Sequence, residues 1–472
     1  MAVREGMTDM EDQAKTNPLG TERVSGLMIK FSIPSIIAMV IGAVYNIVDQ
    51  LFIGHAVGTL GNAATNVVFP LTTSCVALGL LFGIGGASCF NLTMGRNNPK
   101  KAVHYIGNAL VLLFGSGVAL CIFTQIFMTP LLHAFGTPDD VFPYALNYLR
   151  ITSIGFPFLI LTTGGGHLIR ADASPKITMA CSLTGAVLNT VLDAVFVLGF
   201  QWGMRGAALA TIIGQIVSGI MVVIYMRGFK TVPLHRIHLR VRRSYIKEIV
   251  TIGLASFVNQ ICMMVVQIVM NNSLTYYGAL SVYGEAIPLA CSGIIMKVYQ
   301  IFFTVIIGLS QGAQPIESFN YGAKLYRRVR EAYWTALLVG AVISVASFIF
   351  FRLFPRQILQ WFGSNTEEYF EFGVMFFQIF MFFTWLNFLQ PISSNFFTAI
   401  GKPKKGIFLS MTRQLIFILP LILILPIRFG IMGLLYSAPV ADLLSAIVSV
   451  FMIRAEFRAM RALEKSEQPE AV

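Results

Sequence analysis

The sequence predicts an all-α polytopic membrane protein with 12 transmembrane helices in two pseudo-symmetric six-helix lobes. Of its 472 residues, 56% are hydrophobic and only 12% are charged, and the mean hydropathy is +0.73. A soluble chain of this length carries about twice that share of charged residues. Apolar runs of about 20 residues, the length that crosses roughly 30 Å of hydrocarbon, recur along the chain. An internal repeat supplies the division into two lobes.

The apolar runs give the helices in chain order. The predicted spans cover residues 31–54, 62–92, 102–128, 142–166, 174–199, 205–227, 247–277, 284–308, 331–353, 370–397, 407–427 and 431–455. The distribution of positive charge then predicts the orientation. With a cytoplasmic N-terminus, 27 of the 34 Lys and Arg residues fall in cytoplasmic segments, and only Arg205, Arg352, Arg356 and Arg428 fall in outer segments. Cytoplasmic segments are the ones enriched in Lys and Arg, so both termini are expected in the cytoplasm.

The repeat joins motifs about 226 to 228 residues apart. Residues 173–176 (Ala-Ser-Pro-Lys) recur as residues 401–404 (Gly-Lys-Pro-Lys), and residues 85–87 (Gly-Gly-Ala) as residues 311–313 (Gln-Gly-Ala). Six spans in each half give the lobes the same orientation, related by an axis along the membrane normal. The expected organisation is an N-terminal tail (1–26), a first lobe (27–227), a basic cytoplasmic linker (228–246), a second lobe (247–455) and a C-terminal tail (456–472).

Several classes of protein have no support. Residues 1–26 lack the apolar core of a signal peptide. The net charge of +12 follows the pattern of membrane orientation, so no nucleic-acid partner is expected. The six cysteines lie in apolar segments without a C-x-x-C spacing and are expected to be small core residues. No nucleotide-binding, zinc-binding or nucleophile motif is present, so the chain is predicted not to be an enzyme and to need no cofactor.

Two aspartates near the outer ends of apolar spans are the main candidates for function. Asp49 lies 18 residues past Phe31, about 27 Å along the first span. Asp193 lies 19 residues past Ser174, about 28 Å along the fifth. A carboxylate in hydrocarbon costs about 3 kcal/mol or more, and such residues usually pair, bind an ion or carry a proton. Their equal depth predicts a shared ion or proton site.

Other polar residues at this level complete the predicted site. Asn189 lies one helical turn before Asp193, and Thr211 lies at a similar depth in the sixth span. Two carboxylates, an amide and a hydroxyl can hold Na⁺, or the two acids can share one proton. The structural alternative is that Asn189 and Thr211 are interhelical hydrogen-bond partners. Tyr45, one turn before Asp49, and Glu285, at the start of span eight, are weaker candidates for substrate binding.

Three further ionisable residues lie within the predicted spans. Arg413 and Asp442 are at similar depths in spans eleven and twelve, and a structural ion pair is expected. Lys297 lies three turns into the eighth span, and the sequence indicates no partner for it.

Together these motifs resemble the multidrug and toxic compound extrusion (MATE) family over about residues 25–455, and most closely its MepA-type and DinF-type bacterial members. The motifs that carry the resemblance are residues 33–34 (Ile-Pro), 45–49 (Tyr-Asn-Ile-Val-Asp), 95–102 (Gly-Arg-Asn-Asn-Pro-Lys-Lys-Ala), 173–176, 189–193 and 206–211 (Gly-Ala-Ala-Leu-Ala-Thr). The resemblance implies a V-shaped fold, drug efflux in exchange for H⁺ or Na⁺, and a first-lobe cation site at Asp49, Asn189, Asp193 and Thr211. The seventh and tenth spans lack the acidic residues of other family branches, which favours coupling in the first lobe.

The expected function is therefore secondary antiport of lipophilic, often cationic drugs across the cell (plasma or inner) membrane. The chain is expected to be embedded in the lipid bilayer as a monomer. The alternative is a lipid-linked precursor flippase, which would need a larger cationic cavity to hold a pyrophosphate. A channel is disfavoured because the duplicated lobes contain no filter-like repeat.

Overall fold

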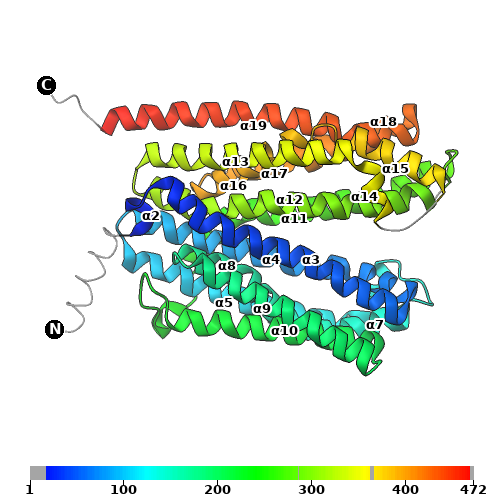
Figure 1. Cartoon of the computed structure of the whole chain (residues 1–472). Helices are drawn as coiled ribbons and strands as arrows, with labels where there is room; N and C mark the ends of the chain where they lie inside the picture. Colours follow the sequence, from blue (N-terminus) through cyan, green and yellow to red (C-terminus); the bar gives the residue numbers. More distant parts are fainter. Residues whose placement is uncertain (1–16, 285, 362–365, 468–472) are drawn as a thin grey trace.

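The computed structural model describes residues 17–284, 286–361 and 366–467, and these residues form helices and connecting segments with no strand. Twelve helical segments among them are long and apolar enough to cross a membrane, which confirms the predicted number of spans. The helices form two groups that lie one above the other in Figure 1, with α3 to α10 below and α11 to α19 above.

The first group contains the elements that precede the linker. They are α2 (Pro18–Thr21), α3 (Val24–Val57), α4 (Thr59–Gly95), α5 (Pro99–Ile126), α6 (Met128–Ala134), α7 (Phe142–Thr152), the 3₁₀-helix η1 (Ser153–Gly155), α8 (Phe156–Ala171), α9 (Pro175–Asp193), the π-helix η2 (Ala194–Gly199) and α10 (Gly203–Arg227). A 3₁₀-helix, η3 (Arg236–Leu239), lies in the linker between the groups.

The second group repeats this arrangement. It contains α11 (Arg243–Ala279), α12 (Ala286–Gly322), α13 (Tyr326–Leu353), α14 (Pro355–Gln360), α15 (Glu367–Phe380), the 3₁₀-helix η4 (Thr384–Leu386), α16 (Leu389–Ala399), α17 (Pro403–Met411), the π-helix η5 (Thr412–Ile418), α18 (Leu419–Phe429) and α19 (Ile431–Glu467).

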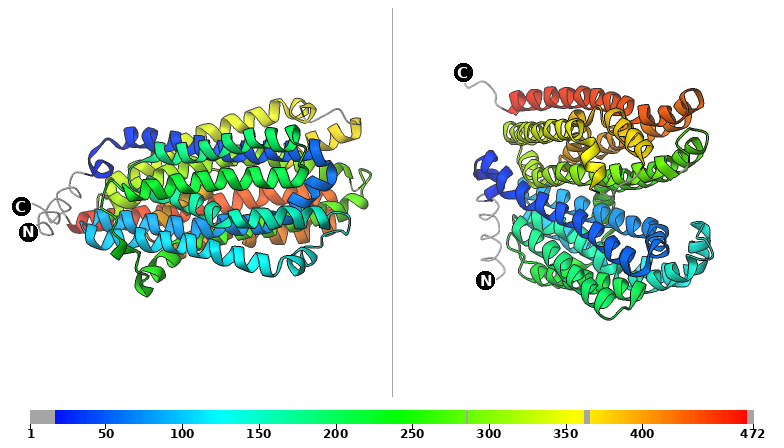
Figure 2. Two further views of the ribbon diagram at one scale, coloured as in Figure 1. Left: turned by 90° about the horizontal axis from the view of Figure 1, so that it is seen from below. Right: turned by 45° about the vertical axis from the view of Figure 1, so that its right-hand side comes forward.

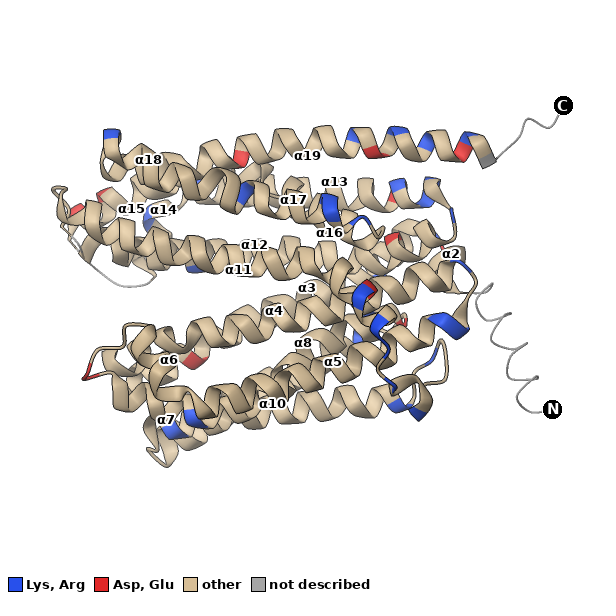
Figure 3. Ribbon diagram, turned by 180° about the vertical axis from the view of Figure 1, so that it is seen from behind, with Lys and Arg blue, Asp and Glu red and all other residues tan. Residues whose placement is uncertain are grey.

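The two ends of the molecule differ in charge. Most Lys and Arg residues gather at the end where α2 begins and α19 ends, as Figure 3 shows. We call this the basic end and the opposite one the far end. The long apolar helices run between the two ends, and the charge asymmetry has the form expected of a chain oriented by its basic segments.

Two glycines at the basic end show the pseudo-two-fold relation between the lobes. A Cβ atom on Gly95 of α4 would lie 2.2 Å from the carbonyl oxygen of Phe319 on α12. A Cβ atom on Gly322 would lie 2.2 Å from the carbonyl oxygen of Leu92. Leu92 and Phe319 are separated by the same number of residues as Gly95 and Gly322, so the two contacts are equivalent and reciprocal, as a two-fold interface requires. Only glycine permits this approach of the two backbones.

The lobes contact each other at the basic end and are open to one another at the far end. Helices α12 and α3, α12 and α4, and α11 and α4 pack against each other across the boundary between the lobes. We use the term inter-lobe faces for the sides of α3, α4, α11 and α12 that are turned towards the other lobe. Every residue of α4 from 81 to 94 and of α12 from 308 to 320 is buried. Towards the far end, buried residues alternate with partly buried and exposed ones along these helices. In the oblique view of Figure 2 the two helix groups remain distinct along their length.

Three predicted spans differ clearly from the observed helices. The twelfth was expected to end at residue 455, but α19 continues to Glu467. The eighth was expected to end at residue 308, but α12 continues to Gly322, because its polar last turns are buried between the lobes instead of entering a loop. The tenth was expected as one helix over residues 370–397, but it is interrupted between Phe380 and Leu389. Pro391 has no N–H to donate and its ring clashes with the carbonyl four residues earlier, which explains a helix that restarts at Leu389.

Candidate functional site

The two aspartates singled out in the sequence meet inside the first lobe. Asp49 on α3 is 8% exposed, and Asp193, the last residue of α9, is fully buried. Their side chains lie within hydrogen-bonding reach of each other. Two carboxyl groups can form a hydrogen bond only when one of them carries a proton, because an ionised carboxylate has no donor. A single shared proton would therefore stabilise this arrangement.

Close packing of α9 and α10 places Asn189 and Thr211 beside this pair. A Cβ atom on Gly214 of α10 would lie 2.8 Å from the carbonyl oxygen of Gly185 on α9, so small residues let the two helices approach. With the amide nitrogen of Asn189 facing Asp193, it donates to Oδ2 at 3.2 Å, and the amide oxygen accepts from the Thr211 N–H at 3.2 Å. Asn189 thus links the acid pair to α10.

Two tyrosines surround the acid pair. Tyr45, one turn before Asp49, lies near both carboxyl groups, as does Tyr148 of α7. The position of Tyr45 follows from its helical spacing to Asp49. Tyr148 was not predicted as a site residue, since nothing in the sequence around it indicates which face of α7 is turned inward. The site therefore draws side chains from α3, α7, α9 and α10.

A change in helix type occurs directly after Asp193. The chain continues from α9 into the π-helix η2, and the second lobe has a π-helix, η5, in the corresponding span. π-helical turns are rare and often lie at functional sites, where they redirect side chains and free backbone groups. The first of these two segments adjoins the acid pair, and the second carries Arg413.

The acid pair has unused capacity to bind a cation. The Oδ1 atoms of Asp49 and Asp193 are both buried without a hydrogen-bond partner. None of the ion pairs among the described residues involves either aspartate. Carboxylate, amide and hydroxyl oxygens suit hard cations such as Na⁺, and the acids themselves suit H⁺. No group of three or more His, Cys, Asp or Glu side chains suited to a metal ion occurs in the part of the chain that the structure describes.

Glu285, the other predicted substrate contact, lies outside the described residues. All six cysteines are free thiols, as expected.

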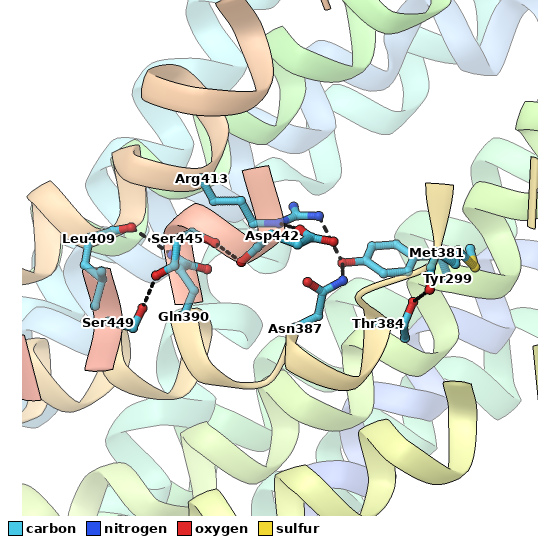
Figure 4. A network of polar contacts seen from close by, with 10 residues as sticks. All are labelled: Tyr299, Met381, Thr384, Asn387, Gln390, Leu409, Arg413, Asp442, Ser445 and Ser449. Carbon is cyan, nitrogen blue, oxygen red and sulfur yellow. Dashed lines mark hydrogen bonds and ion pairs between the residues drawn. The ribbon is translucent and has the colours of Figure 1, made fainter. Parts of the chain in front are cut away.

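The second lobe contains a different polar centre, shown in Figure 4. The Nε atom of Arg413 donates to Oδ1 of Asp442 at 2.7 Å, which confirms the predicted ion pair. Nη2 of Arg413 and Nδ2 of Asn387 both donate to the hydroxyl of Tyr299, at 3.4 and 3.3 Å. Here each charge is matched by an opposite charge, whereas the first-lobe acids have no such partner.

Two buried ionisable residues near the basic end were not predicted. Arg170, which we expected in a cytoplasmic loop, is 4% exposed in the last turn of α8 and donates to Oε1 of Gln311 across the lobe boundary at 3.1 Å. That expectation was wrong, because α8 extends to Ala171 and the second lobe covers its end. Glu317 of α12 is 2% exposed, and its Oε1 has no hydrogen-bond partner. The sequence does not indicate Glu317 as a buried residue, because the predicted eighth span ends at residue 308.

Comparison with known proteins agrees with this architecture. The sequence profile of the MatE family matches residues 34–195 and 255–424, one segment in each lobe. The multidrug export protein MepA of Staphylococcus haemolyticus is 24% identical over 432 residues, which cover 90% of this chain and 92% of that protein. MepA of Staphylococcus aureus strain MSSA476 is 23% identical over 427 residues, again covering 90% of this chain and 92% of that protein.

Solved structures with the same fold include a MOP superfamily transporter from Pyrococcus furiosus, with a TM-score of 0.87, 21% identity, and coverage of 94% of this chain and 98% of that one. The outward-facing conformation of a multidrug resistance MATE family transporter gives a TM-score of 0.86 at 21% identity, with 93% and 99% coverage. The family profile covers more than half of the chain, and the helices repeat as that family's two lobes do. The chain belongs to the MatE family and is a multi-pass membrane transporter, not an enzyme.

Proposed function

We propose that the chain is a secondary multidrug antiporter that exports lipophilic, often cationic compounds in exchange for H⁺, with Na⁺ as the alternative coupling ion. The observation that carries the proposal is the burial of the carboxyl groups of Asp49 and Asp193 within hydrogen-bonding reach of each other. A pair of acids buried without a cationic partner is stable only while a proton or a small cation compensates its charge. Loading and unloading of that ion is the event that can drive transport.

The orientation of the molecule gives the direction of transport. We place the basic end in the cytoplasm, as the distribution of Lys and Arg favours, with both termini on that side and the chain in the plasma or inner membrane. The far end, where the inter-lobe faces are exposed, then opens outward. An ion arriving from outside binds the acid pair as substrate leaves. Its later release towards the cytoplasm accompanies closure of the far end and opening of the basic end.

The proton is the better supported ion. Two carboxyl groups within hydrogen-bonding reach of each other are suited to share one proton. Na⁺ would have to separate them and take oxygen ligands from both, together with Asn189 and Thr211. We therefore assign Asp49 and Asp193 the binding of the coupling ion, and Asn189 and Thr211 the positioning of Asp193. Tyr45 and Tyr148 form the wall of this site.

The substrate class rests on the relatives, which are named multidrug export proteins. A lipid-linked precursor flippase would need several cations for a pyrophosphate. In their halves nearer the far end (residues 37–57, 59–80, 254–279 and 286–307), the four inner helices provide one Lys or Arg, Lys297. That count favours drug efflux over the flippase.

The test is dye uptake into inverted membrane vesicles, in which the lumen corresponds to the cell exterior. A pH gradient, acid inside, and a Na⁺ gradient, high inside at equal pH, are imposed separately. Two lipophilic dyes are offered, one cationic and one zwitterionic, and we expect at least one of them to accumulate with the pH gradient and not with the Na⁺ gradient. Accumulation driven by Na⁺ alone would select the other ion, and no accumulation under either gradient would refute the antiport proposal.

A further inference from the structure

The packing of α3 against α12 fixes the relative height of residues on the two lobes. A Cβ atom on Gly312 would lie 2.5 Å from Cα of Ser32, and one on Gly308 would lie 2.7 Å from Cα of Ile36. The helices are therefore antiparallel and aligned residue for residue. Since both rise about 1.5 Å per residue, the same alignment continued towards the far end places Lys297 level with Ile47. Lys297 is thus within about one helical turn of the height of Asp49, on the opposite lobe.

The side chain of Lys297 is directed towards the first lobe. Lys297 precedes Gly308 by 11 residues, which is about three helical turns, so the two share one face of α12. Gly308 is the residue whose face meets α3. The core of the second lobe lies on the other side of α12, where Ile295 is fully buried and Phe302 is 6% exposed. Lys297 itself is exposed, as the separation of the lobes towards the far end requires.

Among the described residues, Lys297 is the only charge that this part of the inter-lobe faces exposes. In the same four stretches, 37–57, 59–80, 254–279 and 286–307, the only Asp, Glu, Lys or Arg residues are Asp49 and Lys297. Asp49 is turned into the first lobe, where it meets Asp193. Among the described residues Lys297 takes part in no ion pair.

The opposing surface of α3 is polar but uncharged. Asn46 is exposed there, with its Nδ2 donating to the carbonyl oxygen of Gly42 at 2.7 Å, and Gln50 lies one turn further towards the far end. A ligand between the lobes therefore meets one ammonium group and amide side chains, while the two carboxyl groups are withdrawn into the lobe behind α3.

We propose that Lys297 selects substrates that carry an anionic group, above all a carboxylate, and that the preferred cargo is therefore a zwitterionic or anionic amphiphile instead of a permanent cation. This inference rests on the proposed export function and revises its substrate class, from lipophilic cations to lipophilic compounds that carry an anionic group. An ammonium and a carboxylate attract more strongly in the partly dehydrated space between the lobes than in bulk water. The same ammonium repels a ligand whose only charge is positive.

A matched pair of dyes isolates the carboxylate. Rhodamine B carries a carboxylate beside its cationic ring system, and rhodamine B ethyl ester has the same ring system without the negative charge. Binding of each dye to the full chain in lipid nanodiscs is measured by fluorescence polarisation for the wild type, Lys297→Gln, Lys297→Arg and the control Arg352→Gln. Arg352 is a positive charge of α13 that lies over the rings of Phe348 and Phe382, away from the inter-lobe faces.

Lys297→Gln should weaken binding of rhodamine B about tenfold, the effect of one charge-assisted contact, and leave the ester unchanged or bound more tightly. Lys297→Arg should restore the preference, and Arg352→Gln should match the wild type. Equal affinities of Lys297→Gln and wild type for rhodamine B, or an equal loss for both dyes, would overturn the assignment.

The same proteins in vesicles separate this inference from the proposed function. If binding depends on Lys297 but neither dye is transported under any ion gradient, the export proposal is refuted. The role of Lys297 in substrate selection is then still supported. If an ion gradient drives transport of both dyes without any dependence on Lys297, the role of Lys297 in substrate selection is refuted. The export proposal is then still supported.

Discussion

The carboxyl groups of Asp49 and Asp193 lie within hydrogen-bonding reach of each other although they belong to the first and fifth membrane spans. Both are buried, and no ion pair among the described residues compensates either of them. The second lobe instead neutralises its buried acid, Asp442, with Arg413 at 2.7 Å. This asymmetry between otherwise repeated lobes is the physical reason for assigning ion coupling to the first.

Removing either acid should abolish export without unfolding the protein. In Asp49→Asn or Asp193→Asn the amide can still hydrogen bond to the remaining carboxyl, but the pair loses one of its two titratable groups. Cells that depend on this transporter should become as drug-sensitive as cells without it, while the amount of protein in the membrane stays unchanged. Asp140→Asn, at an exposed position near the far end, is the control and should retain full resistance. Resistance retained in Asp193→Asn would argue strongly against coupling at this site.

The reciprocal glycine contact at the basic end should be intolerant of side chains. In Gly322→Leu the new side chain would be forced into the backbone at Leu92, and overpacking of this kind costs about 1–3 kcal/mol. We expect a lower midpoint of thermal unfolding in detergent and loss of dye transport. Gly115→Leu is the control, since no atom lies within 4 Å of a Cβ placed there. A Gly322→Leu protein as active and as stable as wild type would show that the lobes do not need this contact.

The Arg413–Asp442 pair should behave as a structural unit. Breaking it by Asp442→Asn alone leaves a buried guanidinium without its partner and should cost about 3–5 kcal/mol in the free energy of unfolding. The double replacement Arg413→Met with Asp442→Leu removes both charges and should recover most of that loss. Thermal unfolding followed by intrinsic fluorescence measures both effects.

Glu317→Gln offers a contrast, because Glu317 forms no ion pair among the described residues and its replacement should be nearly neutral. Full stability of Asp442→Asn would contradict the structural assignment of the pair.

Asp172 should hold the start of the linker against the first lobe. Its carboxylate accepts hydrogen bonds at 2.7 Å from the hydroxyl of Tyr225 and from the N–H groups of Lys230 and Thr231, and a further one from the Thr231 hydroxyl. Hydrogen bonds to a charged group contribute about 1.5–3 kcal/mol, so Asp172→Ala should release this segment.

Limited trypsin digestion of inverted vesicles should then cut the linker several times faster than in wild type, at exposed arginines such as Arg236. Thr231→Val, which removes only the hydroxyl contact, should show a smaller increase. Equal digestion of Asp172→Ala and wild type would refute this role for the carboxylate.

Sequence reasoning succeeded where a single physical constraint dominates. Hydrocarbon thickness requires long apolar runs, which gave the twelve spans. The cost of burying charge made Asp49 and Asp193 conspicuous, and the depth calculation brought them together because each lies on a nearly straight helix. The same reasoning paired Arg413 with Asp442.

It failed where packing between segments decides the outcome. Arg170 sits in the last turn of α8, where it contacts Gln311 of the other lobe. Glu317 sits in the part of α12 that continues beyond the predicted span and is also buried. Tyr148 lies at the site because the face of α7 that carries it is turned inward. The pattern of polar and apolar residues in α7 does not indicate which face this is. Lys297 was recognised as an isolated cation, but its direction followed only from the contact of Gly308 with α3.

Proton release on substrate binding tests the central claim most directly. Binding of an exported compound to the purified transporter is measured by calorimetry in buffers with different ionisation enthalpies, which reports the number of protons exchanged. If Asp49 and Asp193 share a proton that substrate binding displaces, the wild type should release one proton per bound molecule and Asp193→Asn should release none. Binding of an exported compound to the wild type without proton release, or the same release from Asp193→Asn, would contradict the account.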